Sequence, residues 1–380
     1  MKLSILRYNL YRLSKRIALG PLGGGALGSN LCRTLAEGRA DPAVASHVAD
    51  SQKIASACVQ SYSFPDDFPP EFPREAAFDA KFVYRLRDVV VVPRTGLAWF
   101  PGGPLLQESA GSLPRLFQKR ISATLRRPVP LSESGPVVVF PTFSYYHVLF
   151  DVLANVLHAL AFVPSAKILL PARHPRFVDG ILDFLGIPEE KRMTAGGVVF
   201  VKDLVFAPLW VNGGFIPPVD LETLRSALLP RIPRGGKTPS KIYISRSLSP
   251  NRPLANEAEV EQELSKRGFS IVHFEKIPFA EQMQLVAGAS TIVAPHGAGL
   301  ANLVAATPGT HVVEFLSRNW FNTCYAKLAM QLGCDYHFIE SNFPNLRTER
   351  KKFSSLPHVS FSDILASSSA RSPELSVVKR

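Results

Sequence analysis

Cysteine is scarce in this 380-residue sequence, which has only 4, and none lies in a CxxC pair or in a cysteine–histidine spacing suited to zinc. A disulfide scaffold is therefore excluded, and a reducing compartment is expected. Long apolar runs are also missing. None reaches the ~20 residues that span a bilayer, so we predict no transmembrane segment. The hydrophobic content of 46% is normal for a globular protein, and the length predicts two domains.

Acidic residues are absent from residues 1–36, which carry six basic side chains. Residues 345–380 add a net charge of +4, so the two ends hold ten of the twelve net positive charges of the chain. A protein that binds nucleic acid is expected to carry its basic residues on the folded body. Because the body here is nearly neutral, the charge distribution argues against a nucleic-acid partner.

The basic N-terminal segment places four leucines on one helical face: Leu3, Leu6, Leu10 and Leu13. Such a helix can rest on an anionic membrane surface, and peripheral membrane contact through the N-terminus is one interpretation. Arg7 and Arg12 interrupt the apolar region that a signal peptide needs. An organelle transit peptide would have a similar composition, and a solvated leader without a role is the third interpretation.

Two proline-rich segments divide the chain. Phe64–Pro73 is too rich in proline for a helix or a central strand, and Pro230–Lys241 is the clearest domain boundary. We predict a basic leader with a connector over residues 1–75, an N-terminal domain over 76–232, a C-terminal domain over 233–345 and a tail over 346–380.

Apolar runs of strand length alternate with helical periods in both predicted domains. The first should contain strands at Val89–Val92, Pro136–Phe140, Lys167–Leu170 and Val198–Phe206, and helices at His147–Phe162, Phe177–Leu185 and Leu221–Leu229. The second should contain strands at Ile242–Ser245, Ser270–Phe274, Thr291–Ala294 and His311–Phe315, and helices at Glu257–Arg267, Phe279–Ala287, Ala298–Ala306 and Phe321–Leu332. This alternation predicts parallel strands in βαβ units, and hence an α/β fold of two Rossmann-like domains facing each other across a cleft.

The segment STIVAPHGAGLANL (Ser290–Leu303) is the sharpest local signal. A strand runs into His296, Gly297, Ala298 and Gly299, and the following helix start offers N–H groups to an anion such as a diphosphate. The turn is not GxGxxG, so the nicotinamide pattern is incomplete. The alternative is a tight turn with glycines for packing and a capping histidine.

Two arginines and one glutamate belong near the same edge of the predicted sheet. Arg246 leaves the carboxyl end of a strand and Arg252 follows in a loop, where both could bind phosphate oxygens; the alternative for Arg252 is a solvated loop residue. Glu314 ends the strand THVVEF and could accept the hydroxyls of a ribose, or turn into solvent.

An apolar helix in the first half carries a stripe of four polar residues: His147, Asp151, Asn155 and His158. Their spacing of 4, 4 and 3 keeps them on one face, and the stripe contains none of the lysine, glutamate or glutamine typical of a solvated face. We favour a wall of a cleft for His147 and Asp151, and a buried neutral histidine for His158. The alternative for the pair is a hydrogen bond that only ties down the helix.

The motifs KIYISR, NRPLANEAEV, PHGAGLANL, PGTHVVEF and YYHVLFD resemble glycosyltransferase family 61 in order and spacing. The resemblance implies a fold of the GT-B type with the nucleotide-sugar donor, expected to be a uridine diphosphate sugar, in the C-terminal domain. It implies that Arg246 and the turn His296–Gly299 hold the diphosphate, that Arg252 assists and that Glu314 binds ribose. Asp151 is the preferred base with His147 as its partner, and Asn155 and Asn302 are added as cleft residues.

Members of the family are inverting and need no metal, which agrees with the lack of an Asp-x-Asp motif here, so no cofactor and no metal are expected. The resemblance also implies a glycan or lipid-linked glycan acceptor in capsule or exopolysaccharide synthesis. It further implies a bacterial, cytoplasmic version of the family, and the basic N-terminus is the segment that could place it peripherally at the inner membrane. Two alternatives stay open. One is a Rossmann-fold oxidoreductase, and the other is a non-catalytic nucleotide- or glycan-binding subunit of a polysaccharide assembly.

Overall fold

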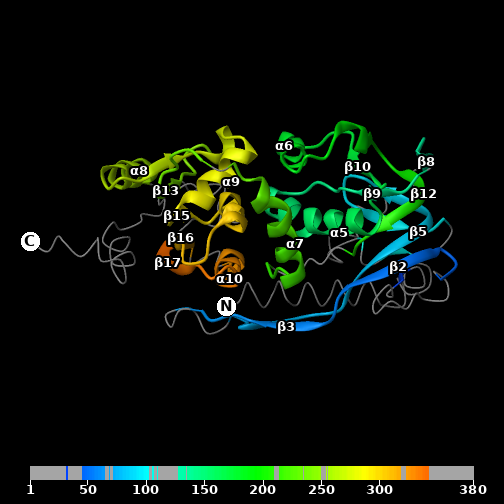
Figure 1. Ribbon diagram of the computed structural model, residues 1–380, viewed down its shortest axis with the longest axis horizontal. Coiled ribbons are helices and arrows are strands. Elements are labelled where there is room, and N and C mark those ends of the chain that lie inside the picture. The colour runs from blue at the N-terminus through cyan, green and yellow to red at the C-terminus, as the bar shows by residue number, and fades with distance from the viewer. Residues whose placement is uncertain are drawn as a thin grey trace, which may run out of the picture. The chain divides into compact units, whose positions relative to one another are not determined.

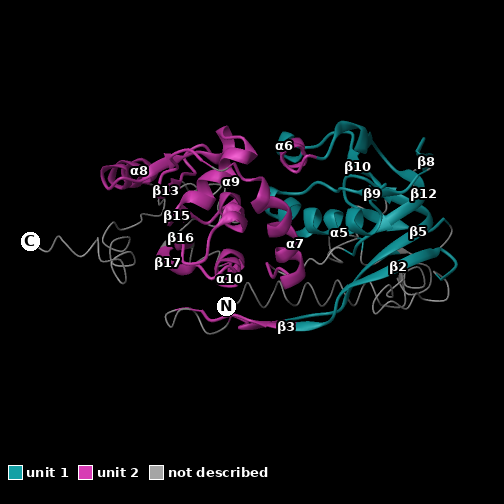
Figure 2. Ribbon diagram, in the orientation of Figure 1, with its two compact units in different colours: residues 1–58, 77–178, 187–211 teal, residues 59–76, 179–186, 212–380 magenta. Residues whose placement is uncertain are grey.

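The computed structural model describes residues 31–32, 45–64, 68, 72–101, 105–106, 109, 127–133, 135–208, 214–233, 235–249, 254, 256–317 and 322–341. The predicted N-terminal helix, the C-terminal tail and Arg252 therefore lie outside the described residues. The chain divides into two compact units, which Figure 2 colours separately. Unit 1 holds residues 1–58, 77–178 and 187–211, and unit 2 holds residues 59–76, 179–186 and 212–380.

This division differs from the boundary that the sequence analysis placed at residues 232–233. The last and longest segment of unit 2 begins at residue 212, so the helix α7 (Pro218–Leu228) belongs to it and not to the N-terminal domain. The segment around the expected boundary is an internal loop of unit 2. There the Gln284 side chain donates to the Gly235 carbonyl at 3.1 Å, and Gly288 packs against Thr238. Proline and glycine mark a loop here, and the limit of the unit lies elsewhere.

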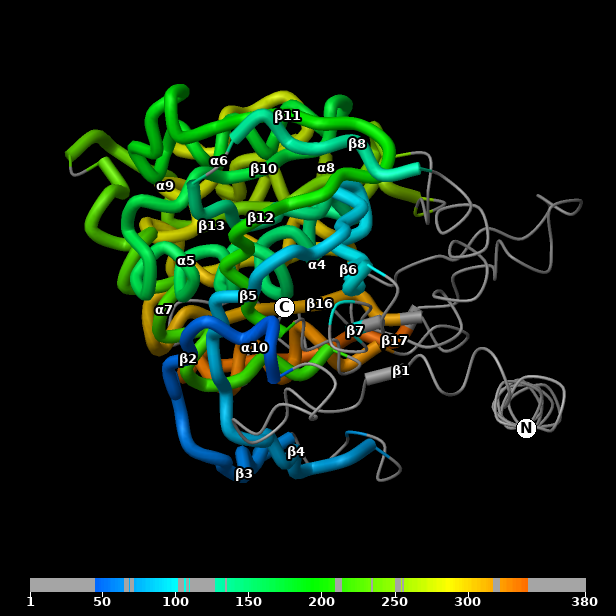
Figure 3. Tube along the Cα trace, turned by 90° about the vertical axis from the view of Figure 1, so that its right-hand side faces the viewer, coloured from blue at the N-terminus to red at the C-terminus, as the bar shows by residue number. Residues whose placement is uncertain are grey.

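Unit 1 is built on a ten-stranded sheet with the order β1-β7-β6-β5-β12-β9-β10-β11, in which β2 also pairs with β5 and β8 with β12. The strands are β1 (Leu31–Cys32), β2 (Val48–Ala55), β5 (Lys81–Val92), β6 (Leu97–Trp99), β7 (Leu105–Leu106), β8 (Val129–Pro130), β9 (Val137–Val139), β10 (Lys167–Pro171), β11 (Arg192–Ala195) and β12 (Val199–Phe206). Figure 3 shows the long β5 beside β2.

The sheet of unit 1 is mixed: β12, β9, β10 and β11 are parallel, as predicted, whereas β5 adds antiparallel pairs with β12, β2 and β6 that the sequence does not predict. Strand β12 is the junction, because it pairs parallel with β9 and antiparallel with β5. Only the last four residues of β5 form the continuous apolar run that the sequence analysis identified as a strand. Its earlier residues mix polar and apolar side chains, as is typical of an antiparallel strand with one solvated face.

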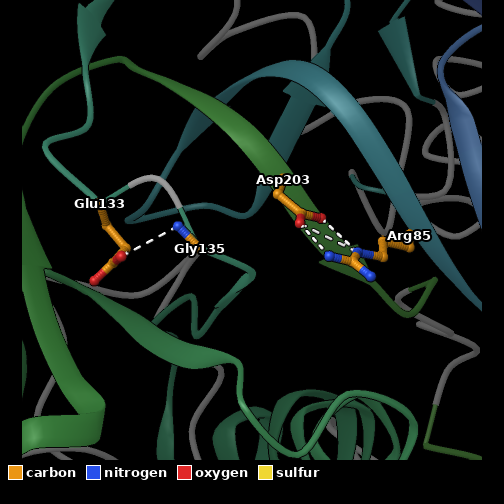
Figure 4. A network of polar contacts seen from close by, with 4 residues as sticks. All are labelled: Arg85, Glu133, Gly135 and Asp203. Carbon is orange, nitrogen blue, oxygen red and sulfur yellow. Dashed lines mark hydrogen bonds and ion pairs between the residues drawn. The ribbon is translucent and has the colours of Figure 1, made fainter.

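An ion pair connects the two antiparallel central strands of unit 1. Arg85 on β5 donates to Asp203 on β12 from Nε at 2.9 Å and from Nη2 at 2.6 Å (Figure 4). Asp203 is almost fully buried, so both of its oxygens need these donors. In the same view, the Glu133 carboxylate accepts from the Gly135 backbone at 3.1 Å.

One long helix of unit 1 carries the predicted polar stripe. It begins as α4 (Tyr145–His147), continues through a π-helical segment η3 (Val148–Leu153) and ends as α5 (Ala154–Phe162), which packs on β9 and β5. By length and composition Tyr145–Phe162 could cross a membrane, and no other helix among the described residues could. However, 56% of that window is buried inside the protein, as is typical of a core helix.

Unit 2 contains a five-stranded sheet with the order β14-β13-β15-β16-β17, and all of its strands are parallel. Its strands are β13 (Lys241–Ile244), β14 (Ser270–Val272), β15 (Thr291–Pro295), β16 (His311–Ser317) and β17 (Asp335–Ser341). Its helices include α7, α8 (Glu257–Lys266), α9 (Phe279–Gly288), the 3-10 helix η7 (Ala298–Ala305) and α10 (Cys324–Gln331), which lie around the sheet in Figure 1. The prediction of an α/β fold with parallel strands is therefore confirmed for this unit.

The remaining elements are short. A two-stranded sheet pairs β3 (Cys58–Ser61) with β4 (Glu75–Phe78). The helix α6 (Arg176–Phe184) follows β10, and the 3-10 turns are η4 (Glu189–Lys191), η5 (Leu229–Arg231) and η6 (Phe274–Lys276).

Candidate functional site

The strand order of unit 2 creates a topological switch point between β13 and β15. The chain runs from β13 outward to β14 on one side, and then to β15, β16 and β17 on the other. In open parallel sheets, ligands bind outside the carboxyl ends of the strands where the order reverses. Arg246 follows β13 and His296 follows β15, so two predicted site residues lie on either side of the switch point.

Arg246 lies directly against Gly297. A Cβ atom on Gly297 would be 1.9 Å from Nη1 of Arg246, so only glycine lets the guanidinium occupy this place. The backbone of Gly297 is extended (φ −176°), and the requirement is therefore for space and not for an unusual conformation. Gly299 is needed for a different contact, since its Cβ would lie 2.9 Å from the Ile244 side chain. The glycines of the HGAG turn thus serve close packing on both sides.

The loop that carries Arg246 is fixed by a buried carboxylate. Glu257, in the first turn of α8, accepts from the backbone N–H of Arg246 at 2.9 Å and from the Tyr243 hydroxyl at 2.8 Å. Burial, followed by the charge of Glu257, raises the pKa of Tyr243 well above its ordinary value. Nη2 of Arg246 also donates to Ser249 Oγ at 2.8 Å. These contacts hold the guanidinium at the switch point before any ligand binds.

A second buried network orients His296. Its Nδ1 lies 2.5 Å from Oε1 of Glu314, and the Tyr336 hydroxyl donates to Oε2 of the same carboxylate at 2.6 Å. Glu314 is fully buried and lies inside β16, so the alternative in which it turns into solvent is wrong. Both of its oxygens have protein partners, and we therefore assign it to positioning His296, although the sequence analysis predicted contact with ribose. Burial, together with Glu314, raises the pKa of Tyr336 well above its ordinary value.

The helix after the glycine turn is a 3-10 helix, although the sequence predicts an α-helix over Ala298–Ala306. It starts at Ala298 with Gly297 as its N-cap, and no side chain caps it. The first N–H groups of a helix have no intrahelical acceptor, and those of Ala298 and Gly299 therefore remain for an anion. Leu300 to Ala305 are buried, so the helix is held by its packing against the core of unit 2.

Lys327 is a buried cation that sequence reasoning missed. It lies in the first half of α10 with its Nζ 3.2 Å from the centroid of the Phe215 ring. Desolvation by burial lowers its pKa from 10.5 to about 8. Two residues earlier, the Tyr325 ring lies 5.1 Å from the His296 ring. Helix α10 therefore presents both an aromatic ring and an easily deprotonated amine within unit 2.

In unit 1, His147 and Asp151 form the predicted pair. His147 Nδ1 lies 2.5 Å from Asp151 Oδ2, and the pair spans the start of the π-helical segment η3. The His147 side chain is 35% exposed, whereas that of Asp151 is 12% exposed. The carboxylate thus holds the ring from the protected side. A π-helical insertion in an α-helix is often found at a functional site.

Asn155 and Asn302, the two predicted cleft residues, make hydrogen bonds within their own units. Asn155 is buried, donates to the Asp151 carbonyl at 2.7 Å and lines a small cavity of about 30 Å³ in unit 1. Asn302 is fully buried, and its amide donates to Gln282 at 2.8 Å, which connects η7 to α9. The expectation that both residues line a cleft stays a prediction. His158 is buried, as predicted.

The comparisons with known proteins agree with the sequence resemblance. The family model described as Glycosyltransferase 61 matches residues 145–313. The β-1,2-xylosyltransferase RCN11 of Oryza sativa subsp. japonica is 35% identical over 66 residues, which are 17% of this chain and 12% of that protein. The β-1,2-xylosyltransferase of Arabidopsis thaliana is 32% identical over 76 residues, which are 20% of this chain and 14% of that protein. The matched part is thus a small share of these relatives.

Among solved structures, the bacterial iron-containing dodecameric glycosyltransferase TibC from enterotoxigenic E. coli aligns with 63% of this chain and 68% of its own. The sequence identity is 14% and the TM-score is 0.28, which is too low to establish a common fold. The family match, in contrast, contains His147, Asp151, Arg246 and His296. The region from residue 145 to residue 313 is therefore the part of the chain that is similar to the glycosyltransferase 61 family.

Proposed function

We propose that this chain is an inverting glycosyltransferase of the GT-B type that needs no metal and transfers a sugar from a uridine diphosphate donor to a glycan. The observation that carries the proposal is the guanidinium of Arg246 packed on Gly297 at the switch point of a parallel sheet. A cation held beside free backbone N–H groups suits the two phosphates of a nucleotide sugar. The match to glycosyltransferase 61 over residues 145–313 supports the same chemistry.

Unit 2 would bind the donor. As the glycosidic bond to the diphosphate breaks, negative charge builds up on the leaving phosphate, and fixed positive groups stabilise that charge. Arg246, the N–H groups at the start of η7 and the oriented His296 ring are such groups. Arg252 remains a proposed assistant from the loop after Arg246.

Unit 1 would supply the base that takes the proton from the acceptor hydroxyl. The sequence analysis prefers Asp151 for this role, and the geometry supports His147 instead. His147 is the more exposed of the two, and its Nδ1 is bound to Asp151, so Nε2 is the nitrogen that can accept a proton. Asp151 would then fix the tautomer of the ring and stabilise its protonated form, as a carboxylate does in histidine-based dyads.

The named relatives and the family resemblance indicate which donor and which acceptor class to test first. The two plant relatives are named β-1,2-xylosyltransferases, and a pentose donor such as uridine diphosphate xylose is therefore the first to test. A glycan or lipid-linked glycan of a surface polysaccharide, made at the cytoplasmic side of a membrane, is the acceptor class that the family resemblance favours.

The test combines binding and turnover. The full chain should be stabilised against heat by uridine diphosphate and its sugars and not by NAD(P), because a bound ligand stabilises the folded state. Mass spectrometry should then detect sugar transfer to added glycans. Protection by NAD(P) alone would favour an oxidoreductase, and nucleotide binding without transfer to any glycan would favour a non-catalytic subunit.

Substitutions at the pair in unit 1 separate an enzyme from a binding subunit. His147→Gln should lower the transfer rate by about 10²-fold or more while leaving the fold and nucleotide affinity unchanged. Asp151→Asn should lower the transfer rate less and shift the pH profile of that rate, since Asp151 acts through the His147 ring. His47→Gln, which removes another imidazole of unit 1, is the matched control. Full activity in both dyad variants would leave the helix with a structural role only.

A further inference from the structure

Three side chains converge at the edge of the unit 2 sheet opposite the candidate donor site. His311 is the first residue of β16 and Asp335 the first of β17, and the two are register partners in this parallel pair. His337 follows two residues after Asp335 and therefore points to the same face of the sheet. All three lie at the amino ends of their strands, whereas Arg246 and His296 follow carboxyl ends.

The distances within this cluster match those between metal ligands. Nδ1 of His311 lies 3.1 Å from one oxygen of Asp335, and Nε2 of His337 lies 3.2 Å from the other. One ligand atom from each residue falls within 4.8 Å of the others. Ligands bound to zinc at about 2.0–2.1 Å in a tetrahedral arrangement are separated by roughly 3.3 Å, so only a small adjustment would be needed.

The ligand types select a class of ion. Two imidazoles and one carboxylate suit zinc and similar divalent transition metals, whereas magnesium and calcium prefer oxygen ligands.

Neighbouring groups leave the cluster open to solvent on one side. Asp335 and His337 are 43% and 29% exposed, so an ion could enter and keep water as its remaining ligand. Cys334 precedes Asp335 and points to the other face of the strand, where its sulfur contacts the Thr307 carbonyl at 3.8 Å. Burial raises the pKa of Cys334 to about 11, so it is no thiolate ligand at neutral pH.

We propose that His311, Asp335 and His337 form a binding site for a divalent transition-metal ion of the zinc class. The ion would connect the start of β17, an edge strand of this sheet, to its neighbour β16. Its role is structural, because the site lies at the edge of the sheet opposite the candidate donor site. The inference does not depend on the proposed function. If Nδ1 of His311 binds the ion, its Nε2 carries the N–H, and this buried atom has no hydrogen-bond partner. Such a partner normally strengthens metal binding by a histidine, so we expect only micromolar affinity.

The experiment uses the untagged full chain after treatment with a chelator and its removal. Titration calorimetry with zinc chloride at neutral pH should give one site per chain, and magnesium chloride should give none. Zinc should also raise the midpoint of thermal unfolding, since binding to the folded state stabilises it.

Single substitutions test which residues bind. His337→Ala should weaken zinc binding by about tenfold or more, and Asp335→Asn, which keeps the shape of the side chain, should do the same. His273→Ala removes another imidazole of unit 2 outside the cluster and should leave zinc affinity unchanged. Circular dichroism without metal checks that each variant folds; if His337→Ala does not, Asp335→Asn decides. The absence of zinc binding to the parent chain, or equal affinity in the folded cluster variants, would overturn the proposal.

Discussion

At the scale of single residues, the arginine and the glycine at the switch point depend on each other. Gly297→Ala places a methyl group where Nη1 of Arg246 lies, so the guanidinium must move away from the proposed diphosphate position. We expect uridine diphosphate to bind less tightly by about 2 kcal/mol, the range for one charge-assisted hydrogen bond, and Arg246→Ala to have a similar effect. Titration calorimetry measures both.

The control for this prediction is Gly180→Ala, in the helix α6. A Cβ atom there would meet only the Phe279 Cβ, at 3.9 Å, which is an ordinary contact. Its nucleotide affinity should equal that of the parent chain. If Gly297→Ala binds the nucleotide as tightly as this control, the guanidinium is not part of the donor site.

The lowered pKa of Lys327 predicts how the free energy of unfolding depends on pH. Its pKa is lowered from 10.5 to about 8 in the folded chain, so between these values the unfolded state binds more protons than the folded state. Stability therefore rises with pH through this window, and burial of the charged amine costs most below pH 8. Lys327→Met should gain unfolding free energy relative to the parent chain below pH 8, and the gain should shrink toward pH 9.

Urea denaturation at several pH values measures this difference, in which other titrating groups cancel. Lys237→Met removes an exposed lysine of the same unit, and its difference from the parent should not change with pH. A gain for Lys327→Met that stays constant from pH 7 to pH 9 would show that the amine is not desolvated as the geometry indicates.

The sequence identifies part of the candidate site at this scale and misses the rest for a definable reason. His147, Asp151, Arg246 and His296 follow from spacing along one helix or from their places at strand ends, which a sequence displays. The partners of these residues come from other elements. Tyr336, on β17, reaches Glu314 on β16, and Glu257 reaches back to the loop after β13. Such pairs depend on the register of strands and the packing of helices, which residue spacing does not contain.

At the scale of elements, the segment that the sequence predicts as a connector contains a buried residue, Phe68, which packs within unit 2. Phe68 is 2% exposed, stacks on Phe64 with ring centroids 4.3 Å apart and meets the edge of the Phe338 ring at 5.2 Å. Phe338 belongs to β17, so Phe68 packs against the edge strand of the unit 2 sheet. The sequence analysis expects a connector because proline excludes regular structure, but aromatic residues between prolines can still pack into a core.

Phe68→Ala should therefore destabilise the protein by about 3–4 kcal/mol, the cost of truncating a buried phenylalanine. Val59→Ala is the control, since Val59 lies in the same segment of unit 2 and is 65% exposed. It should change stability by less than about 0.5 kcal/mol. Urea denaturation followed by circular dichroism measures both, and a loss for Phe68→Ala no larger than for Val59→Ala would show that this segment is not packed on unit 2.

At the scale of the whole molecule, the two units differ in how well their sequences predict them. In unit 2, β13 to β16 are short apolar runs between helices, and parallel strands buried on both faces have this pattern. Its last strand, β17, was missed because DYHFIES alternates polar and apolar residues. In unit 1, β2 and the first half of β5 share this mixed character, and the antiparallel pairing of β5 with β2 and β12 joins residues far apart in the chain. Pairing between distant segments is what the sequence alone does not specify.

The need for metal is a property of the whole protein, and it separates the two proposals made above. At the carboxyl edge of the unit 2 sheet, Glu257, Glu261 and Glu314 each accept hydrogen bonds from protein donors. Under the proposed function, the charge of the diphosphate is met by Arg246 and backbone N–H groups and not by a chelated cation. Transfer in excess chelator should therefore equal transfer with added magnesium or manganese.

Because the proposed zinc site lies at the opposite edge of the unit 2 sheet, the same chelator should lower the midpoint of thermal unfolding of the zinc-loaded protein without lowering the transfer rate. A rate that falls in chelator and returns with magnesium would contradict the metal-independent mechanism, and a rate restored only by zinc would assign the cluster of His311 a part in catalysis.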